Sequence, residues 1–389
     1  MQIAQCSYMF KYIFVSIKEH LNFQQMKRIC LLISLIMLCC CDKPDTGDPI
    51  TPPVAAPENQ KPEGGNQDQD QEEEALPMVI VGYATYWDTV MPDPTLLTHI
   101  NYAFAHIKND FETLDIKTPS RLKKIVALKD KNPDLKIMLS IGGWGAGNFS
   151  EMAADETHRK NFCKNCLAAV EQYGFAGIDL DWEYPTSSSG GISSSPNDTK
   201  NFTLLLKDLR EVLGDDLLIT MASSSSAKYV DFKSAIQYLD FVNIMTYDMG
   251  DPPKHNAALH PSSMSSRSCE ESVKFHKDKG VPYNKIVLGM PFYGHGNESD
   301  VPESVDYRDL GKYLEKFTRM WDDKAKVPYL VNSEGKMVLT YDDEESIALK
   351  ADFVKSKGLR GAMYWNIEAD DKNWTLSKAI STRLLPTQE

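Results

Sequence analysis

Three acidic residues alternate with apolar residues in the segment 176–185, which reads AGIDLDWEYP. In an extended strand Asp179, Asp181 and Glu183 would point to one side, with about 6.5–7 Å between successive acids. The side chains between them would point to the other side: Ile178, Leu180 and Trp182. Three ionised carboxylates so close together would repel one another, so at least one pKa should be raised and a proton shared. Such a row suits a general acid at its exposed end, with the other carboxyl groups beneath it.

The same alternation also fits an amphipathic strand that faces solvent, in which the acids have no chemical role. The position of the strand in the fold separates the two interpretations, because catalytic groups gather at the C-terminal ends of the strands in a parallel barrel. The elements around residues 176–183 therefore matter as much as the acids themselves.

Eight short apolar segments with β-forming residues recur along the chain. They cover residues 78–85, 99–105, 136–143, 176–183, 217–223, 241–247, 285–293 and 361–367. Helical patterns at 120–132, 201–214 and 343–358 separate several of them. This alternation predicts an α/β fold, the parallel (β/α)8 or TIM barrel. A doubly wound open sheet is the structural alternative, but no Gly-rich nucleotide-binding fingerprint follows the first strand.

The cysteines predict neither a disulfide framework nor a metal site. Five of the eight precede residue 42, which leaves Cys163, Cys166 and Cys269. Three cysteines cannot all pair, and the CxxC of Cys163 and Cys166 lies inside a predicted helix, 157–173. We expect inert thiols or one local bridge. No histidine and carboxylate cluster has the spacing of metal ligands, so no metal is expected.

The segment 26–41 reads MKRICLLISLIMLCCC and has the pattern of a signal peptide. Two basic residues precede an apolar run that is short for a membrane span. Its end resembles a bacterial lipobox, which predicts lipidation of Cys41, with Cys39 and Cys40 as alternatives. An uncleaved anchor helix is the other interpretation. In the signal-peptide interpretation, residues 1–25 precede the true start at Met26. We then expect an exported bacterial lipoprotein, in the outer membrane or on the cell surface.

Residues 42–77 are rich in Pro, Gln, Asp and Glu and nearly free of large apolar residues. Such a segment cannot bury enough surface to offset its ordering entropy, so we expect a disordered tether before a folded domain at 78–389. The formal net charge of the chain is −13. This charge argues against a nucleic-acid partner and against an anionic membrane surface, both of which favour basic patches. Contact with the membrane is expected only through the lipid anchor.

Four further segments join the acidic row. They are SIGGW (140–144), MTYD (245–248), GMPFYG (289–294) and GAMYW (361–365). With AGIDLDWEYP they resemble, in the same order, the motifs of glycoside hydrolase family 18, the chitinase-like enzymes: the SxGG strand, the DxxDxDxE signature, the MxYD strand and the last two strands. The resemblance runs from about residue 79 to 372, which is nearly all of the predicted folded part. One such motif is weak, but five in order are highly specific.

The resemblance implies a retaining mechanism in which the substrate assists its own cleavage. Glu183 would protonate the glycosidic oxygen, and the 2-acetamido oxygen of the sugar would attack the anomeric carbon. Asp181 would orient the acetamido N–H, while Asp179 would share a proton with Asp181. Tyr247 would donate its hydroxyl to the acetamido oxygen, with Asp248 beside it. The implied substrate carries an N-acetyl group on the sugar that is cleaved, and no cofactor is needed.

The resemblance also implies an aromatic site for the sugar. Trp365 would form its apolar floor, and Trp144 would stack on a neighbouring sugar. The expected walls are Tyr83, Phe104, Met245 and Tyr293. For Phe104 and Met245, packing inside the barrel is the alternative role.

Three features depart from the family pattern. Ala176 stands where the signature has its first Asp, which bears on the rate more than on the mechanism. His295 stands where many of these chitinases have an arginine. The insertion between strands seven and eight, about 297–340, is short, from which we expect a missing wall and an open, shallow groove.

The expected substrate is chitin or another N-acetylglucosamine oligosaccharide, hydrolysed by a monomeric enzyme. Two alternatives remain. One is an endo-β-N-acetylglucosaminidase that acts on N-glycans, although Trp182, Tyr184 and Pro185 around Glu183 look more like the chitinase branch. The other is a non-catalytic sugar-binding protein, although such relatives typically lack the catalytic Glu, which this chain retains.

Overall fold

The computed structural model describes residues 76–386. The predicted signal segment, Cys41 and nearly all of the tether at 42–77 lie outside the described residues, so these remain predictions. Within the described part, no helix is both long enough and apolar enough to cross a membrane.

Eight parallel strands close into a barrel, and all eight correspond to the predicted segments. In chain order they are β1 (Val79–Thr85), β2 (His99–Ile107), β4 (Lys136–Gly142), β5 (Gly177–Asp181), β6 (Leu218–Ser224), β7 (Phe241–Met245), β8 (Ile286–Pro291) and β14 (Gly361–Trp365). Each pairs with its neighbour in this order, and β1 pairs with both β2 and β14. This closure excludes the open sheet and confirms the (β/α)8 barrel. The short β3 (Leu114–Ile116) pairs antiparallel with β2 at the rim.

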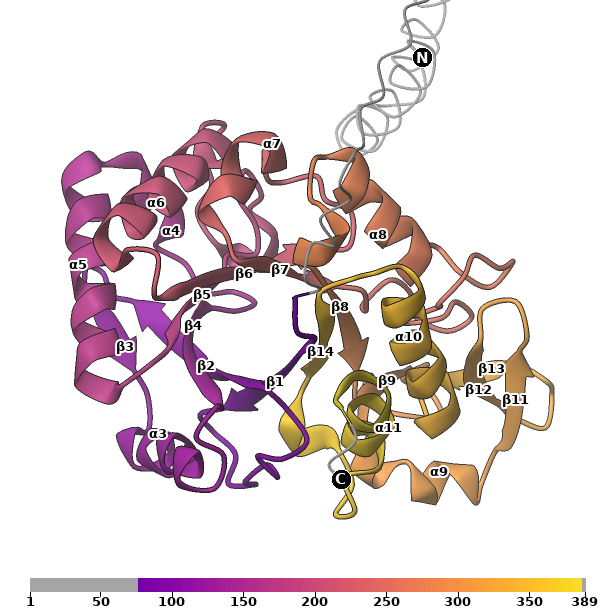
Figure 1. Cartoon of the computed structure of the whole chain (residues 1–389). Coiled ribbons are helices and arrows are strands. Elements are labelled where there is room, and N and C mark those ends of the chain that lie inside the picture. Colours follow the sequence, from indigo (N-terminus) through magenta and orange to yellow (C-terminus); the bar gives the residue numbers. More distant parts are fainter. Residues whose placement is uncertain (1–75, 387–389) are drawn as a thin grey trace, which may run out of the picture. The chain divides into compact units, whose positions relative to one another are not determined.

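The helices lie outside the ring of strands (Figure 1). They are α3 (Pro119–Val126), α4 (Phe149–Ala154), α5 (Glu156–Tyr173), α6 (Asp198–Leu213), α7 (Phe232–Ala235), α8 (Cys269–Asp278), α10 (Glu344–Ser356) and α11 (Thr375–Leu384). The predicted helix at 120–132 is shorter than expected. It ends at Val126 and continues as one 3-10 turn, Ala127–Asp130.

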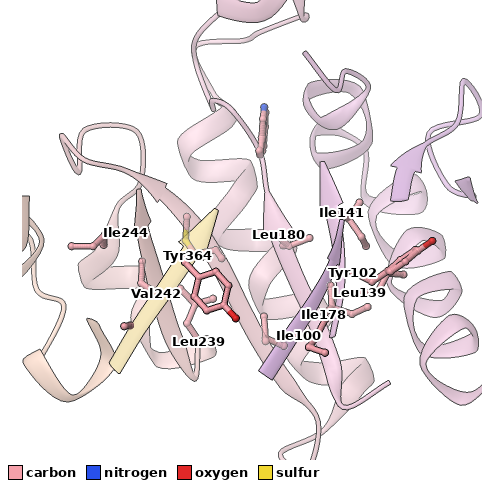
Figure 2. Close-up of a cluster of buried hydrophobic side chains, with 14 of the residues drawn as sticks. Ile100, Tyr102, Leu139, Ile141, Ile178, Leu180, Leu239, Val242, Ile244 and Tyr364 are labelled. Atoms are coloured by element: carbon pink, nitrogen blue, oxygen red, sulfur yellow. The ribbon is translucent and has the colours of Figure 1, made fainter. Parts of the chain in front are cut away.

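The barrel strands alternate between two cores, as period-two side chains require. Ile178 and Leu180 of β5 belong to the outer layer between strands and helices, together with the other side chains labelled in Figure 2. Trp182 continues this row: its ring stacks on Phe149 of α4 with centroids 5.3 Å apart, and it meets Phe202 of α6 edge-on. The outward face of the acidic segment is therefore anchored in the helix layer, and its acids must face the barrel interior.

The insertion after β8 is more structured than the sequence suggested. It forms a five-stranded antiparallel sheet in the order β10-β9-β13-β12-β11, with the short helix α9 (Gly311–Leu314). The strands are β9 (Tyr293–Gly296), β10 (Ser304–Asp306), β11 (Thr318–Asp322), β12 (Val327–Val331) and β13 (Met337–Thr340). The sheet has its own apolar core, which includes Val305, Leu330 and Leu339. The sequence did not predict this sheet, because its strands have only three to five residues.

The three cysteines of the described residues are free and buried, so the alternative of a local bridge is wrong. Cys163 and Cys166 lie on α5, in the outer apolar core. Burial raises the pKa of Cys163 to about 12 and raises that of Cys166 well above its ordinary value. Thiols held in the neutral form are poor nucleophiles and poor metal ligands, so the CxxC pair is inert.

Candidate active site

Asp179 lies at the bottom of the site, fully buried inside the barrel. Four side chains donate hydrogen bonds to its carboxylate: Tyr83 Oη (2.9 Å), Ser140 Oγ (2.8 Å), Thr220 Oγ1 (2.6 Å) and Asn243 Nδ2 (3.2 Å). Burial raises the pKa of Asp179, and these donors oppose the rise. Side chains from four other strands thus bond one carboxyl group, which fixes the position of β5 at the bottom of the site.

Asp181 lies one step higher on β5 and is also buried. Its Oδ1 has no hydrogen-bond partner within the described residues. Burial raises its pKa well above the ordinary value, and the charges of Glu183 and Asp179 add to the rise. An unpaired buried carboxyl oxygen costs about 1–3 kcal/mol, a cost that a ligand with a hydrogen-bond donor at this place would remove.

Two glycines at the end of β4 allow its backbone to lie close to the Asp181 carbonyl group and to the ring of Phe104. A Cβ on Gly142 would lie 2.0 Å from the carbonyl oxygen of Asp181, and the φ of Gly142 is +123°. A Cβ on Gly143 would lie 2.6 Å from the ring of Phe104. The backbone N–H of Gly143 donates to the Asp181 carbonyl at 2.9 Å. The two glycines of SIGGW are therefore steric requirements of the site.

Glu183 stands at the mouth of the barrel. The prediction placed it inside the strand, but β5 ends at Asp181, so Glu183 belongs to the turn that follows. Burial raises the pKa of Glu183 to about 7, a hydrogen bond with Tyr184 lowers it, and the charge of Asp248 raises it. A carboxyl group with a pKa near neutrality holds a proton that it can donate and later recover, as a general acid and base must.

A cavity of about 370 Å³ opens over these acids. It is lined by Asp181 and Glu183 and by every aromatic or apolar side chain predicted for the sugar site: Tyr83, Phe104, Trp144, Met245, Tyr247, Tyr293 and Trp365. Asp248 lines it as well, whereas Asp179 lies beneath it. The structure therefore brings together residues from segments up to about 280 positions apart, while their individual roles remain predictions.

Trp365 ends β14 and lines the cavity, while its role as the floor for the sugar stays a prediction. Its ring stacks on Phe104 with centroids 5.6 Å apart and planes at 14°, and Tyr83 packs against it at 5.6 Å. Phe104 both packs inside the barrel and lines the cavity, while its contact with a sugar stays a prediction. Trp144 differs, because its side chain is 65% exposed at the rim. An exposed indole beside a cavity offers an apolar face for stacking.

Tyr247 and Asp248 follow β7 and line the cavity. Tyr247 is buried, and its hydroxyl lies 3.8 Å from Met363 Sδ, a weak contact that leaves the hydroxyl free to bond a ligand. Asp248 has a left-handed backbone, with φ of 53°. Its N–H donates to Asn256 Oδ1 at 2.6 Å, and Tyr293 donates its hydroxyl to Asp248 Oδ1.

Several lining residues were missed by sequence reasoning: Tyr86, Trp87, His106 and Ala222. Tyr86 and Trp87 directly follow β1 and pack edge to face at 4.9 Å, and Trp87 is largely exposed. The signal was available, since aromatic residues just after a barrel strand face the C-terminal rim. Ala222 could not be predicted in this way, because a small apolar residue in a strand is typical of a buried core position.

A second cavity of about 630 Å³ adjoins the first and shares Trp144, Glu183, Asp248, Tyr293 and Trp365 with it. Residues in β9 and in or just before β10 also line it: His295, Glu303, Ser304 and Asp306. The expectation of a missing wall is therefore wrong, because the strands β9 and β10 at the start of the insertion supply one. Within residues 76–386, no three histidine, cysteine or carboxylate side chains converge as a metal ion would require.

The fold and the site together define a (β/α)8 barrel of the glycosidase class, with a carboxyl general acid above two buried aspartates in an aromatic cavity. The comparisons agree: the model of Glycosyl hydrolases family 18 matches residues 79–370, and the chain belongs to this family.

Among curated relatives, Chitinase A1 of Niallia circulans is 33% identical over 407 residues, covering 78% of this chain and 58% of the relative. The chain therefore spans less than two thirds of that protein. Chitinase B of Serratia marcescens is 29% identical, covering 73% of this chain and 75% of the relative. Among solved structures, a family 18 N-acetylglucosaminidase from Paenibacillus barengoltzii aligns with a TM-score of 0.72 at 34% identity, covering 79% of this chain and 100% of that one.

Proposed function

We propose that the chain hydrolyses β-1,4-linked N-acetylglucosamine polymers or oligosaccharides, with retention, as a chitinase-like enzyme. One observation carries the proposal: Glu183, with a pKa of about 7, and the unpaired Oδ1 of Asp181 line the same aromatic cavity. The chitinases among its relatives support this substrate class. The enzyme acts as a monomer in this proposal.

The proposed reaction uses two groups of this chain, Glu183 and Asp181, and one group of the substrate. Glu183 gives its proton to the glycosidic oxygen as the bond from that oxygen to the anomeric carbon breaks. The acetamido oxygen of the same sugar forms the new bond to that carbon, and Asp181 accepts the acetamido N–H and stabilises its growing positive charge. Water then attacks the anomeric carbon, the bond between that carbon and the acetamido oxygen breaks, and the water loses a proton to Glu183, which restores the starting state.

Chitotetraose and a high-mannose N-glycopeptide distinguish the candidate substrates. We expect the chain to release chitobiose from the tetrasaccharide and to leave the glycopeptide intact, as read by mass spectrometry. Cleavage of the glycopeptide alone would move the assignment to the endo-β-N-acetylglucosaminidase. Binding without turnover, equal in the wild type and in Glu183→Gln, would show a sugar-binding protein.

The rate should depend on pH through Glu183. The acid must be protonated to start the reaction, and its pKa of about 7 lies above the ordinary value of 4.5. We therefore expect kcat/KM to fall about tenfold per pH unit above neutrality, while an ordinary carboxyl group would already limit the rate near pH 4.5. Initial rates on chitotetraose between pH 4 and 9 measure this; a flat profile up to pH 9 would contradict it.

We further propose that the chain is exported and anchored by a lipid on Cys41. The support comes from the residues 26–41 and from the acidic, Pro-rich stretch that follows them. The mature N-terminus, read by mass spectrometry of the membrane-extracted protein, tests this. A protein that retains residues 26–40, or a Cys41→Ser variant that is still lipidated, would contradict the choice of Cys41.

A further inference from the structure

His295 lies between two carboxylates at the edge of the cleft. Its Nε2 is 3.0 Å from Asp248 Oδ1, and its Nδ1 is 2.5 Å from Asp251 Oδ1. Its own side chain is 16% exposed, whereas those of the aspartates are 59% and 74% exposed. The ring thus sits beneath the loop after β7 and contacts it with both nitrogens, from the first strand of the inserted sheet.

Both contacts are satisfied only by the imidazolium form. A neutral imidazole has one N–H and one lone pair, so it can donate to one carboxylate while its other nitrogen faces an acceptor. The imidazolium donates to both. Burial lowers the pKa of His295, but the hydrogen bonds with Asp248 and Asp251 outweigh this and raise it above the ordinary value.

The remaining surroundings also favour the cation. The ring of Tyr293, on the same strand, lies 5.6 Å from that of His295. Besides His295 and Asp248, the titratable side chains that line the second cavity are acidic or phenolic: Glu183, Tyr184, Tyr293, Glu303 and Asp306. No Lys or Arg side chain lines this cavity among the described residues. His295 is therefore the one cationic side chain in an acidic lining.

Asp248 is the point at which this arrangement meets the chemistry. It lines both cavities and adds to the raised pKa of Glu183 through its charge. Its left-handed backbone is a conformation that costs a non-glycine residue about 1 kcal/mol, so it needs support from its surroundings. That support comes from Asn256, which accepts its N–H, and from Tyr293 and His295 on β9, which bond its carboxylate.

We propose that His295 is a positioning residue of the cleft: as an imidazolium it clamps Asp248 and Asp251, and so holds the loop after β7 in the shape that receives the substrate. These two contacts of His295, with Asp248 and with Asp251, are called the clamp below, and they join the barrel to the inserted sheet. Loss of the histidine proton breaks one of its two hydrogen bonds and leaves Asp248 less restrained beside Glu183. The inference about substrate rests on the proposed function, whereas the protonated clamp does not.

The protonation state is tested first, without substrate. In the chain labelled with ¹³C-histidine, NMR titration should place the pKa of His295 above the ordinary 6.5, with the resonance assigned by its loss in His295→Gln. Asp251→Asn should lower that pKa. A His295 that titrates at or below 6.5, or that does not respond to Asp251→Asn, would overturn the clamp.

The positioning role is tested by binding in the Glu183→Gln background, where Glu183 cannot titrate. Calorimetry with chitotetraose should show that Kd rises about tenfold as His295 loses its proton, equivalent to one pKa unit of coupling. At every pH, His295→Gln should bind chitotetraose as weakly as the parent protein does after His295 has lost its proton. His295→Arg, which keeps a permanent cation, should lose the pH dependence.

In the otherwise wild-type enzyme, His295→Gln should raise KM while kcat changes less than twofold, and thermal unfolding separates this effect from misfolding. A Kd that is constant across the measured titration, or a His295→Gln variant with wild-type KM, would overturn the positioning role. If the wild type neither binds nor cleaves chitotetraose, the proposed function fails, and the NMR titration alone decides whether the protonated clamp exists.

Discussion

Replacing Glu183 with Gln is expected to lower kcat on chitotetraose by about 10³- to 10⁴-fold, the upper part of the range for a general acid. The amide keeps the size of the side chain but has no acidic proton to give to the glycosidic oxygen. The leaving sugar would then depart as an alkoxide in a half-buried site. Asp181 does not replace the acid, because it lies deeper on β5, below the mouth of the barrel.

The matched control is Glu171→Gln, which makes the same substitution on the exposed side of α5, the helix that precedes β5. That variant should keep the wild-type kcat. Glu183→Gln should still bind chitotetraose with a Kd within about threefold of the wild type, because the aromatic floor is intact. A loss of less than tenfold in kcat would remove Glu183 from the role of general acid.

Replacing Asp181 with Asn is expected to lower kcat by about 10²- to 10³-fold, the usual effect of removing one preorganised electrostatic contact to a transition state. The amide is nearly isosteric, so the barrel should keep its structure. The variant loses the negative charge beside the cationic intermediate, which forms only after the glycosidic bond breaks. The effect should therefore fall on kcat, with KM changed much less.

Single-turnover and steady-state rates on chitotetraose measure this effect, with Asp216→Asn as the matched control. Asp216 is an exposed acid just before the N-terminal end of β6 and lines neither cavity, so its variant should behave as the wild type does. An Asp181→Asn enzyme that loses affinity but retains kcat would show that Asp181 binds the ground state. That result would contradict the proposed stabilisation of the intermediate.

The barrel could be predicted because its strands carry two kinds of local information. Each strand is a short apolar run, and β5 in addition alternates acids with Ile178, Leu180 and Trp182. Trp182 lies between Phe149 and Phe202 as the alternation requires, which forces Asp179 and Asp181 inward. The end of the strand was placed two residues late, because the turn at Glu183 continues the same alternation without strand pairing.

The inserted sheet could not be predicted in the same way. Its strands are too short for a clear period of two, and their pairing joins residues that are distant in sequence, such as His295 and Thr340. The wall that it builds, and the contact of His295 with Asp248 and Asp251, depend on that pairing. A departure from the family pattern at residue 295 was visible, but its partners were not.

Periodicities within single segments were enough to predict the class of fold and the row of Asp179, Asp181 and Glu183. The environment of each acid depends on the tertiary structure: four donors bond Asp179, no donor among the described residues bonds one oxygen of Asp181, and the pKa of Glu183 is about 7. Burial and charge are sums over neighbours from many strands, and no single segment contains that sum.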